Sequence, residues 1–458
     1  MATVPGFRYA PEDRRSTDEQ QAQRAAVRAQ IERWVAELSD EPRRRASTAH
    51  AMTVLRDRRG GAPFELDDYE YPVAPYRLLV RKDDVVDVLR EIGSDYAPQT
   101  VPIPELDDLC VLQDIGAGER RLRESGVVAR TVAGGRARPS HVALLGAIRK
   151  AEGGPEPSGP RGGALWQARR ADVGNDGPLV VIIDNGVSAE ERADGWLAGL
   201  ARSDNLDLLN VVPYDGYLDL GAGHGTFTAG IVQQVAPGVR LDVRRALDTE
   251  GVGDEVDIGR EIVRSAVDGA EIINLSLGLV TADDRPPLAL EAAIRIAIRV
   301  AAERHGIHLL LVCAAGNYGD ERPCWPAAFS TEPGFGGHVI SVAALRRNYD
   351  DPKEVVGAEW STHGERVTIS SFGQGVVSTY VVGKESRESD PRGPDTFGKN
   401  SWATWSGTSF AAPQVTGAIV RIMQKAGVQT AHEAFERLVG DGVKVLPGYG
   451  TSIEILSV

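Results

Sequence analysis

The chain has 458 residues, of which 42% are hydrophobic and 25% are charged, a balance typical of globular proteins and long enough for two or three domains. The 51 Lys and Arg residues are outnumbered by 65 Asp and Glu residues, and the formal net charge of −14 argues against nucleic-acid binding and against adhesion to anionic membranes. The three cysteines, Cys110, Cys313 and Cys324, do not have the spacing of a metal site, and the sequence allows one disulfide, between Cys313 and Cys324.

The N-terminal residues carry early acidic side chains and no apolar core, so they do not read as a secretory signal. No apolar run approaches the roughly 18 residues of a membrane span. We therefore expect a cytoplasmic location, with no membrane or nucleic-acid partner, and the sequence leaves the oligomeric state open.

Residues 1–60 are expected to form an N-terminal helical segment. Within it, residues 16–38 begin with the capping-box pattern STDE, and apolar residues then recur at helical spacing (Val27, Ile31, Trp34 and Leu38). Such a one-sided helix either docks on the rest of the chain or binds a partner.

Residues 61–150 have the pattern of a small α/β unit. YRLLVR at 76–81 predicts a strand and DDVVDVLREIG at 83–93 predicts the helix after it, while 106–115 and 125–132 are candidate strands. Residues 151–163 follow as a linker, because eight of their thirteen residues are Gly or Pro.

From residue 164 to 458 strand-like and helix-like segments alternate. Strands are expected within 178–187, 240–247, 270–278 and 307–317, and helices within 254–269 and 288–306. This alternation predicts an α/β fold with a mostly parallel sheet covered by helices on both faces. In such folds functional residues gather at the carboxyl ends of the strands.

Four polar residues lie at these predicted strand ends and helix starts: Asp184, His224, Asn317 and Ser409. Taken singly, each has an ordinary explanation as a turn residue or a helix N-cap. Together they supply what a serine nucleophile requires. An imidazole removes its proton, a carboxylate orients the imidazole, and an amide donor stabilises the oxyanion.

Five segments around these residues resemble the subtilisin-like serine proteases. They are IIDNGV at 182–187, GHGTFTAGIV at 223–232, INLSLG at 273–278, AAGNYG at 314–319 and GTSFAAPQVTG at 407–417. The order Asp, His, Ser is also the subtilisin order. The resemblance covers residues 164–458 and implies the three-layer subtilisin-like fold.

The resemblance implies a role for each residue. Asp184 would orient His224, His224 would act as general base on Ser409, and Asn317 would share the oxyanion hole with the backbone N–H of Ser409. The implied substrate-binding residues are Ser276, Leu277, Gly278, Ala315, Gly316 and Cys324. Cys324 falls where the family commonly has a small residue on the pocket floor, so we expect a shallower pocket.

The implied activity is that of a serine endopeptidase acting through an acyl-enzyme. We expect a processing protease of restricted specificity, because an indiscriminate one would harm its host, with a specific protein or a precursor peptide as substrate. No metal site is expected and no cofactor, although calcium commonly stabilises the family and no loop here shows a convincing ligand spacing. The alternative is a catalytically silent peptide-binding or scaffold protein with the same fold.

The unit at 61–150 has two interpretations. Its strand-then-helix start resembles the inhibitory prosegment of the family, and the alternative is an accessory domain that recruits a substrate or partner. If it is a prosegment, the chain is expected to cleave itself near residues 151–175.

Overall fold

The computed structural model describes residues 53–55, 71–92, 99–113, 135–145, 154–160, 177–211, 215–281, 284–385, 394–424, 428–440 and 444–456. The expected helix at 16–38 and the candidate strand at 125–132 lie outside these residues. Within them, no helix is both long and apolar enough to cross a membrane.

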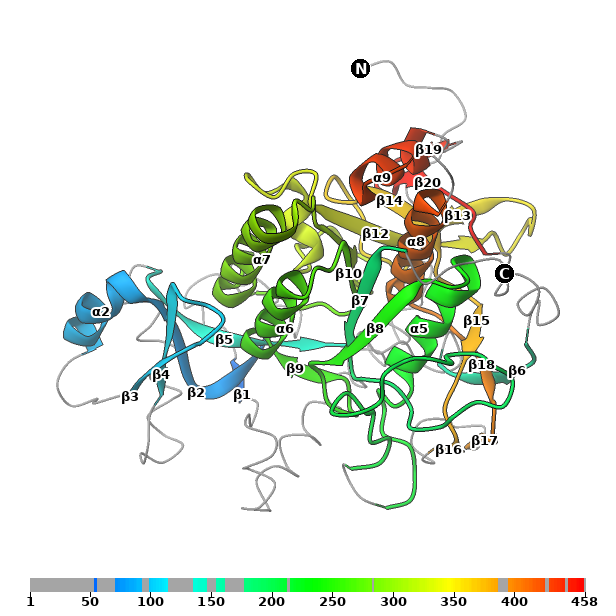
Figure 1. Ribbon diagram of the computed structural model, residues 1–458, viewed down its shortest axis with the longest axis horizontal. Coiled ribbons are helices and arrows are strands. Elements are labelled where there is room, and N and C mark those ends of the chain that lie inside the picture. The colour runs from blue at the N-terminus through cyan, green and yellow to red at the C-terminus, as the bar shows by residue number, and fades with distance from the viewer. Residues whose placement is uncertain are drawn as a thin grey trace.

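A largely parallel sheet forms the centre of the larger domain (Figure 1). Its strands follow the order β19-β20-β14-β12-β11-β10-β7-β8, and every neighbouring pair from β20 to β8 is parallel. The bounds are β7 (Leu179–Asp184), β8 (Arg240–Arg245), β10 (Ile272–Leu275), β11 (Leu310–Ala314), β12 (Val339–Arg347), β14 (Ile369–Phe372), β19 (Lys444–Leu446) and β20 (Gly450–Ser452). The expected strands at 178–187, 240–247, 270–278 and 307–317 are therefore confirmed.

Helices cover both faces of this sheet. They are α5 (His224–Val235), α6 (Glu255–Val267), α7 (Leu288–Val300) with the π-helical turn η4 (Ala301–His305), η5 (Ala327–Thr331), α8 (Thr408–Met423) and α9 (Ala431–Gly440). Successive residues of β7 point to opposite faces, so Ile183 packs with α6 and α7, whereas Ile182 packs with α5 and α8.

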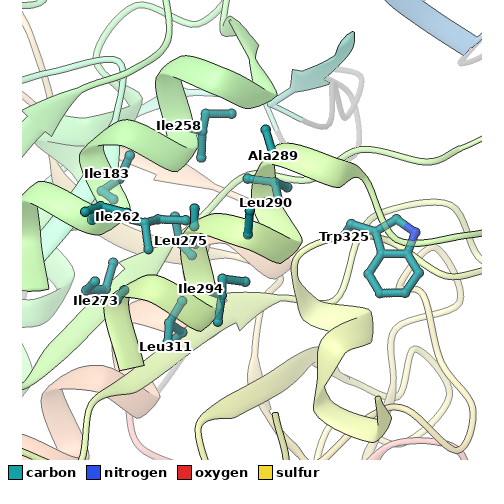
Figure 2. Close-up of a cluster of buried hydrophobic side chains, with 14 of the residues drawn as sticks. Ile183, Ile258, Ile262, Ile273, Leu275, Ala289, Leu290, Ile294, Leu311 and Trp325 are labelled. Carbon is teal, nitrogen blue, oxygen red and sulfur yellow. The ribbon is translucent and has the colours of Figure 1, made fainter. Parts of the chain in front are cut away.

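Figure 2 shows the first of these two cores, where Ile262 and Ile294 of the helices meet Ile273 of the sheet. Because the inner strands β7 and β11 are covered on both faces, they are almost continuous apolar runs rather than alternating ones. An Ile273→Ala substitution would cost about 2–5 kcal/mol of folding free energy. The three-layer α/β arrangement expected from the sequence is confirmed.

Short antiparallel strands complete the larger domain. β13 (Val355–Gly357) pairs with β12, β16 (Gly383–Lys384) pairs with β17 (Thr396–Phe397), and β18 (Trp402–Trp405) pairs with both β15 (Val376–Thr379) and β6 (Glu156–Ser158). The strand β6 lies inside the segment 151–163, for which the composition predicted only a linker. It forms one edge of a three-stranded antiparallel sheet, where β18 pairs with β15 on its other side.

The smaller unit is an antiparallel sheet with one helix. It contains β1 (Thr53–Leu55), β2 (Tyr71–Arg81), the 3-10 turn η2 (Lys82–Asp84), α2 (Val85–Ile92), β3 (Gln99–Pro102), β4 (Leu109–Gln113) and β5 (Ala137–Leu144). Val88 of α2 packs on one face of the sheet, against Val80 and Leu112. The expected strand at 76–81 and the helix after it are present.

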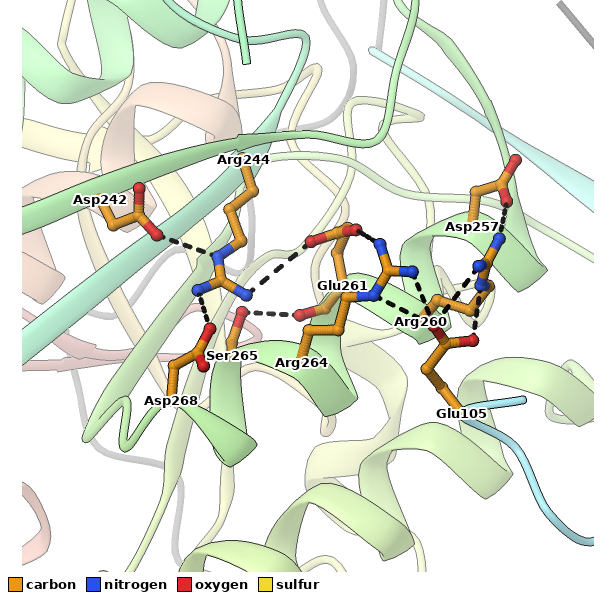
Figure 3. Close-up of polar contacts among 9 residues, drawn as sticks. All are labelled: Glu105, Asp242, Arg244, Asp257, Arg260, Glu261, Arg264, Ser265 and Asp268. Atoms are coloured by element: carbon orange, nitrogen blue, oxygen red, sulfur yellow. Dashed lines mark hydrogen bonds and ion pairs between the residues drawn. The ribbon is translucent and has the colours of Figure 1, made fainter. Parts of the chain in front are cut away.

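The other face of the smaller unit packs on α6 and α7. Leu79, Leu106 and Leu109 belong to the same hydrophobic cluster as Ile258 and Ala289 of these helices. Figure 3 shows a polar clasp beside this contact, in which Glu105 binds Arg260 of α6 at 2.7 Å and Arg264 at 2.6 Å. Burial raises the pKa of the Glu105 carboxyl, but the two arginines outweigh it and hold that pKa below its ordinary value.

Strand β5 joins the two parts. It pairs with β2 inside the smaller unit and, antiparallel, with β9 (Val252–Asp254), the short strand that precedes α6. The smaller unit is thus connected to the larger one by apolar contacts, by ion pairs and by a shared sheet edge.

Candidate active site

The fold brings the four polar residues identified from the sequence to one edge of the sheet. Asp184 is the last residue of β7, and Asn317 follows β11. His224 is the first residue of α5 and Ser409 the second residue of α8. All four are buried, and they stand at strand ends and helix starts as the sequence predicted.

Asp184 and His224 form the clearest pair of the site. Nδ1 of His224 lies 2.8 Å from Oδ1 and 2.9 Å from Oδ2 of Asp184. A carboxylate carries no proton to donate, so Nδ1 must be the protonated ring nitrogen and Nε2 the acceptor. The backbone N–H of Asn185 also donates to Asp184 Oδ1, at 2.8 Å, and fixes the carboxylate.

Asn185 connects this pair to the start of α5. Its Oδ1 accepts the N–H of Gly225 at 2.9 Å, and its Nδ2 donates to Asp207 Oδ2 at 3.2 Å. Gly225 cannot carry a side chain, because a Cβ would lie 2.1 Å from the carbonyl oxygen of Gly186. The carboxyl of Asp207 also accepts the N–H of Gly223 at 2.7 Å. Burial raises the pKa of Asp207 to about 7, against the lowering effect of its backbone donors.

Ser409 and Ser276 exchange two hydrogen bonds. The Ser409 hydroxyl donates to the Ser276 carbonyl at 3.0 Å, and the Ser276 hydroxyl donates to the Ser409 carbonyl at 2.8 Å. Pro413 makes the second bond possible, because it has no N–H for the Ser409 carbonyl four residues earlier. Pro413 lies well inside α8, so it removes a helical bond and Ser276 replaces it.

Aromatic contacts bring His224 to the helix that carries Ser409. The ring of Phe410, the neighbour of Ser409, lies 5.1 Å from the His224 ring, centroid to centroid, and that of Trp405 lies 5.5 Å away. The Ser409 hydroxyl has a single hydrogen, so transfer to His224 requires that it leave the Ser276 carbonyl. Asp184 therefore contacts the His224 ring directly, and Phe410, the residue after Ser409, contacts that ring from α8.

Asn317 is oriented by the residue before Ser409. Its Oδ1 accepts both the backbone N–H and the hydroxyl of Thr408, each at 2.9 Å. The Thr408 hydroxyl in turn accepts the N–H of Gly316 at 3.2 Å. Since both bonds engage the amide oxygen, they fix the orientation of the Asn317 amide plane.

The predicted substrate-binding residues divide into two groups. The side chains of Leu277 and Ala315 are buried in hydrophobic clusters. Gly278 has no side chain, and the Cys324 thiol lies directly against it. A Cβ on Gly278 would lie 2.4 Å from that sulfur, so a larger residue would not fit there.

Cys324 stands between two segments of the site. A Cβ on Gly316 would lie 2.9 Å from its sulfur, so the thiol fills the space between Gly278 and Gly316. Burial, followed by the charge of Asp320, raises the pKa of Cys324 to about 12, which keeps the thiol neutral. Cys313 and Cys324 are both free thiols, so the disulfide that the sequence left open is not formed.

The end of β5 lies along this edge. Leu144 and Gly278 exchange backbone hydrogen bonds, with 3.0 Å from the Leu144 N–H and 3.4 Å from the Gly278 N–H. The N–H of Leu145 donates to the Gly251 carbonyl at 2.8 Å. Residues 142–145 therefore form the middle strand between β9 and the segment around Gly278.

The sequence did not indicate several residues of this site, namely Asn185, Asp207 and Thr408 as hydrogen-bonding supports and Leu144 as a backbone partner of Gly278. No local pattern distinguishes Asp207 from any loop aspartate, because its partners lie 16 and 22 residues away. Among the described residues, no group of three or more His, Cys, Asp and Glu side chains could hold a metal ion.

Comparisons with known proteins agree with this geometry. Residues 175–440, more than half of the chain, match the model of the Subtilase family. Mycosin-4 of Mycobacterium tuberculosis (strain ATCC 25618 / H37Rv) is 32% identical over 305 residues, which cover 60% of this chain and 61% of that protein. Thermitase of Thermoactinomyces vulgaris is 28% identical over 253 residues, which cover 53% of this chain and 73% of that protein.

A solved structure supports the fold. Fervidolysin from Fervidobacterium pennivorans, described as a keratinolytic enzyme related to subtilisin, superposes with a TM-score of 0.52 at 18% identity, covering 85% of this chain and 61% of that one. The chain spans about three fifths of the length of Mycosin-4. Family match, fold and ordered motifs agree, and the chain belongs to the subtilase family.

Proposed function

We propose that the chain is a serine endopeptidase in which Ser409 is the nucleophile. The observation that carries this proposal is the buried pair of His224 and Asp184, held at 2.8 Å beside the helix start that bears Ser409. With Nδ1 bound to Asp184, Nε2 of His224 is the nitrogen that can accept the proton of the Ser409 hydroxyl.

In the proposed reaction, Ser409 Oγ attacks the scissile carbonyl as His224 takes its proton. The imidazolium then gives that proton to the leaving amine, which leaves an acyl-enzyme, and a water molecule activated by His224 releases the acid product. Asn317 and the backbone N–H of Ser409 would stabilise the oxyanion, and the N-terminus of α8 adds favourable potential there.

Hydrolysis of a peptide tests this activity. We choose residues 138–150 of the chain itself, RPSHVALLGAIRK, because part of this segment already lies along the site. After an incubation that allows self-cleavage, the wild-type chain should cleave this peptide and Ser409→Ala should not. Ser401→Ala, a matched change at a serine outside the site, should retain activity. Cleavage that survives in Ser409→Ala would rule out Ser409 as nucleophile.

We also propose that the smaller unit is an inhibitory prosegment rather than a recruitment domain. The support is the backbone pairing of Leu144 with Gly278 and of Leu145 with Gly251. An added β-strand is the way in which extended peptides are recognised at sheet edges, so this segment occupies the place of a substrate.

The antiparallel register suggests which bond is cut. Leu144 pairs with Gly278, and the carbonyl that receives the Ser409 hydroxyl belongs to Ser276, two residues before Gly278. In an antiparallel peptide, the residue two positions after the one that pairs with Gly278 would therefore precede the cut bond. The proposed bond is therefore Gly146–Ala147, on the N-terminal side of the range 151–175 expected from the linker. A glycine there suits a pocket that Cys324 narrows.

N-terminal sequencing of the incubated protein tests this assignment. A new terminus beginning at Ala147 is expected for the wild type, and none for Ser409→Ala. A wild-type chain that stays intact while it cleaves peptides would instead support a recruitment domain.

We propose a cytoplasmic processing role of restricted specificity, with a specific protein or precursor peptide as substrate. One relative that supports it is named Intracellular serine protease, from Paenibacillus polymyxa, 30% identical over 224 residues. Cleavage of many unrelated proteins in a cell extract would contradict this role. Because Asp184, His224 and Ser409 together supply base and nucleophile, we propose that hydrolysis needs no cofactor, so it should persist in a chelator.

The second candidate is a silent peptide-binding or scaffold protein, for which the occupied edge at Leu144 is the favouring observation. Binding of the 138–150 peptide without any hydrolysis would support it.

A further inference from the structure

Two buried carboxylates lie beyond the substrate edge, where β9 turns into α6. Asp254 ends β9 and Glu255 begins α6, and their exposed fractions are 3% and 0%. Because Val142 of β5 pairs with Asp254, the strand that pairs with Gly278 at one end reaches these carboxylates at the other.

Both carboxylates are bound by β5. The Ser140 hydroxyl donates to Asp254 Oδ2 at 2.9 Å. Glu255 Oε1 accepts two donors from His141, the backbone N–H at 2.7 Å and the ring Nδ1 at 2.9 Å. Strand β5 thus presents a hydroxyl to Asp254 and an imidazole to Glu255.

The second oxygen of each carboxylate accepts a hydrogen bond from a backbone N–H of the larger domain. Asp254 Oδ1 accepts the N–H of Val256 at 2.7 Å, and Glu255 Oε2 accepts the N–H of Ala289, near the start of α7, at 2.9 Å. These bonds fix the two acids on the larger domain, so the carboxylates remain in place whichever peptide lies along the edge.

Removal of the smaller unit would uncover the oxygens that Ser140 and His141 occupy. A peptide that again supplies donors to these oxygens forms charge-assisted hydrogen bonds and so gains binding free energy. A cationic side chain gains most, and an acidic one meets like charges.

Resting on the proposed endopeptidase function, we propose that Asp254 and Glu255 form a recognition site for polypeptide substrates that carry a basic residue. That residue lies three positions before the one that pairs with Gly278, and His141 occupies the site in the uncleaved chain. The substrate class is therefore an extended peptide with Arg, Lys or His at this position.

The test uses the full chain, incubated until self-cleavage is complete, and four forms of the 138–150 peptide. They keep His141 or carry His141→Arg, His141→Ala or His141→Glu. We expect kcat/KM to fall in the order Arg, His, Ala, Glu, with about a tenfold span that lies mainly in KM.

Glu255→Gln supplies the matched variant, since it keeps an oxygen for the Ala289 N–H and removes the charge. For this variant, kcat/KM for the His141→Arg peptide and for the His141→Glu peptide should differ by less than about twofold. Glu261→Gln, on the same helix and outside the contact with β5, should keep the wild-type ranking.

Equal cleavage of all four peptides by the wild type would overturn the recognition site and leave the endopeptidase function standing. Retention of the full ranking in Glu255→Gln would also overturn it. If the variant fails to fold, as thermal melting would show, the wild-type ranking decides. Absence of any cleavage would overturn the proposed function and this site with it.

Discussion

Ser276 and Ser409 are joined by two reciprocal hydrogen bonds, hydroxyl to carbonyl in each direction. One bond holds the hydroxyl of the proposed nucleophile, and the other satisfies the carbonyl that Pro413 leaves without its helical donor. The segment around Ser276 and the start of α8 are therefore positioned by one another.

This relationship predicts an energetic coupling. Ser276→Ala should lower the free energy of unfolding by about 1–3 kcal/mol, because the buried Ser409 carbonyl loses its donor. Pro413→Ala supplies an N–H four residues after Ser409, so in that background Ser276→Ala should cost about 1 kcal/mol less. Urea unfolding of the four proteins measures the coupling.

A matched serine provides the control. Ser378→Ala also removes a buried hydroxyl, one that donates to the Phe227 carbonyl, and its cost should be the same with or without Pro413. Strict additivity of Ser276→Ala and Pro413→Ala would contradict the account.

Substitution of Asn317 tests the proposed oxyanion hole. Asn317→Ala should lower kcat by about 10²–10³-fold with little change in KM, because the lost donor acts on the transition state. Asn317→Asp keeps oxygens for the Thr408 donors and should lose as much activity. Near wild-type kcat in Asn317→Asp would show that the oxygen, and not the amide N–H, is the group that matters.

The position of Cys324 predicts a preference for small residues immediately before the cleaved bond. Cys324→Gly should enlarge the space between Gly278 and Gly316 and raise kcat/KM for a peptide with Phe at that position by about tenfold or more. Cys313→Ala, a change at the buried thiol of β11, should leave the preference intact. If Cys324→Gly left the ratio of kcat/KM for the Phe and Gly peptides unchanged, Cys324 would not line the pocket for that residue.

The raised pKa of Asp207 predicts a pH dependence of stability. Its folded value of about 7 exceeds the ordinary value of about 3.9, so the folded state binds the extra proton between these values. The contribution to stability is present at low pH and lost as pH rises through 7. Asp207→Asn cannot titrate, so its melting temperature should gain on the wild type as pH rises from 5 to 8. A constant difference over that range would show that Asp207 keeps an ordinary pKa.

The ion pairs of Glu105 with Arg260 and Arg264 predict the opposite pH dependence for the contact between the smaller unit and the larger domain. The pKa of this carboxyl is lowered in the folded state, so its contribution is present above the ordinary value of about 4.3 and lost as pH falls. Glu105→Gln should raise the rate of self-activation only modestly, about twofold to fivefold, because the clasp is partly exposed.

The readout is the appearance of peptidase activity at neutral pH, and Glu303→Gln on the exposed turn η4 is the control. Equal activation rates for Glu105→Gln and the wild type would show that apolar packing alone holds the smaller unit.

The sequence was sufficient for the parts of the protein that depend on local pattern. Asp184 and Asn317 follow apolar runs that are buried on both faces, and such runs predict strands of a parallel sheet. His224 and Ser409 begin helices, and their neighbouring residues carry the family motifs. The three-layer fold and the grouping of these side chains follow from that pattern.

The features that were missed depend on partners distant in sequence. Composition indicated a linker at 151–163, and the pairing of residues 156–158 with β18 depends on a segment about 245 residues further along the chain. Pro413 lies inside α8, and the Ser409 carbonyl that it leaves without a helical donor is bound by Ser276, 133 residues away in the sequence. The seating of Leu144 against Gly278 joins segments 134 residues apart, which no local pattern encodes.

The most direct test of the central claim is covalent labelling with a serine-directed fluorophosphonate, followed by peptide mapping of the adduct. We expect a single adduct on Ser409 after self-cleavage, lost in Ser409→Ala and strongly slowed in His224→Ala. An adduct on a different serine, or equal labelling of the wild type and His224→Ala, would contradict it.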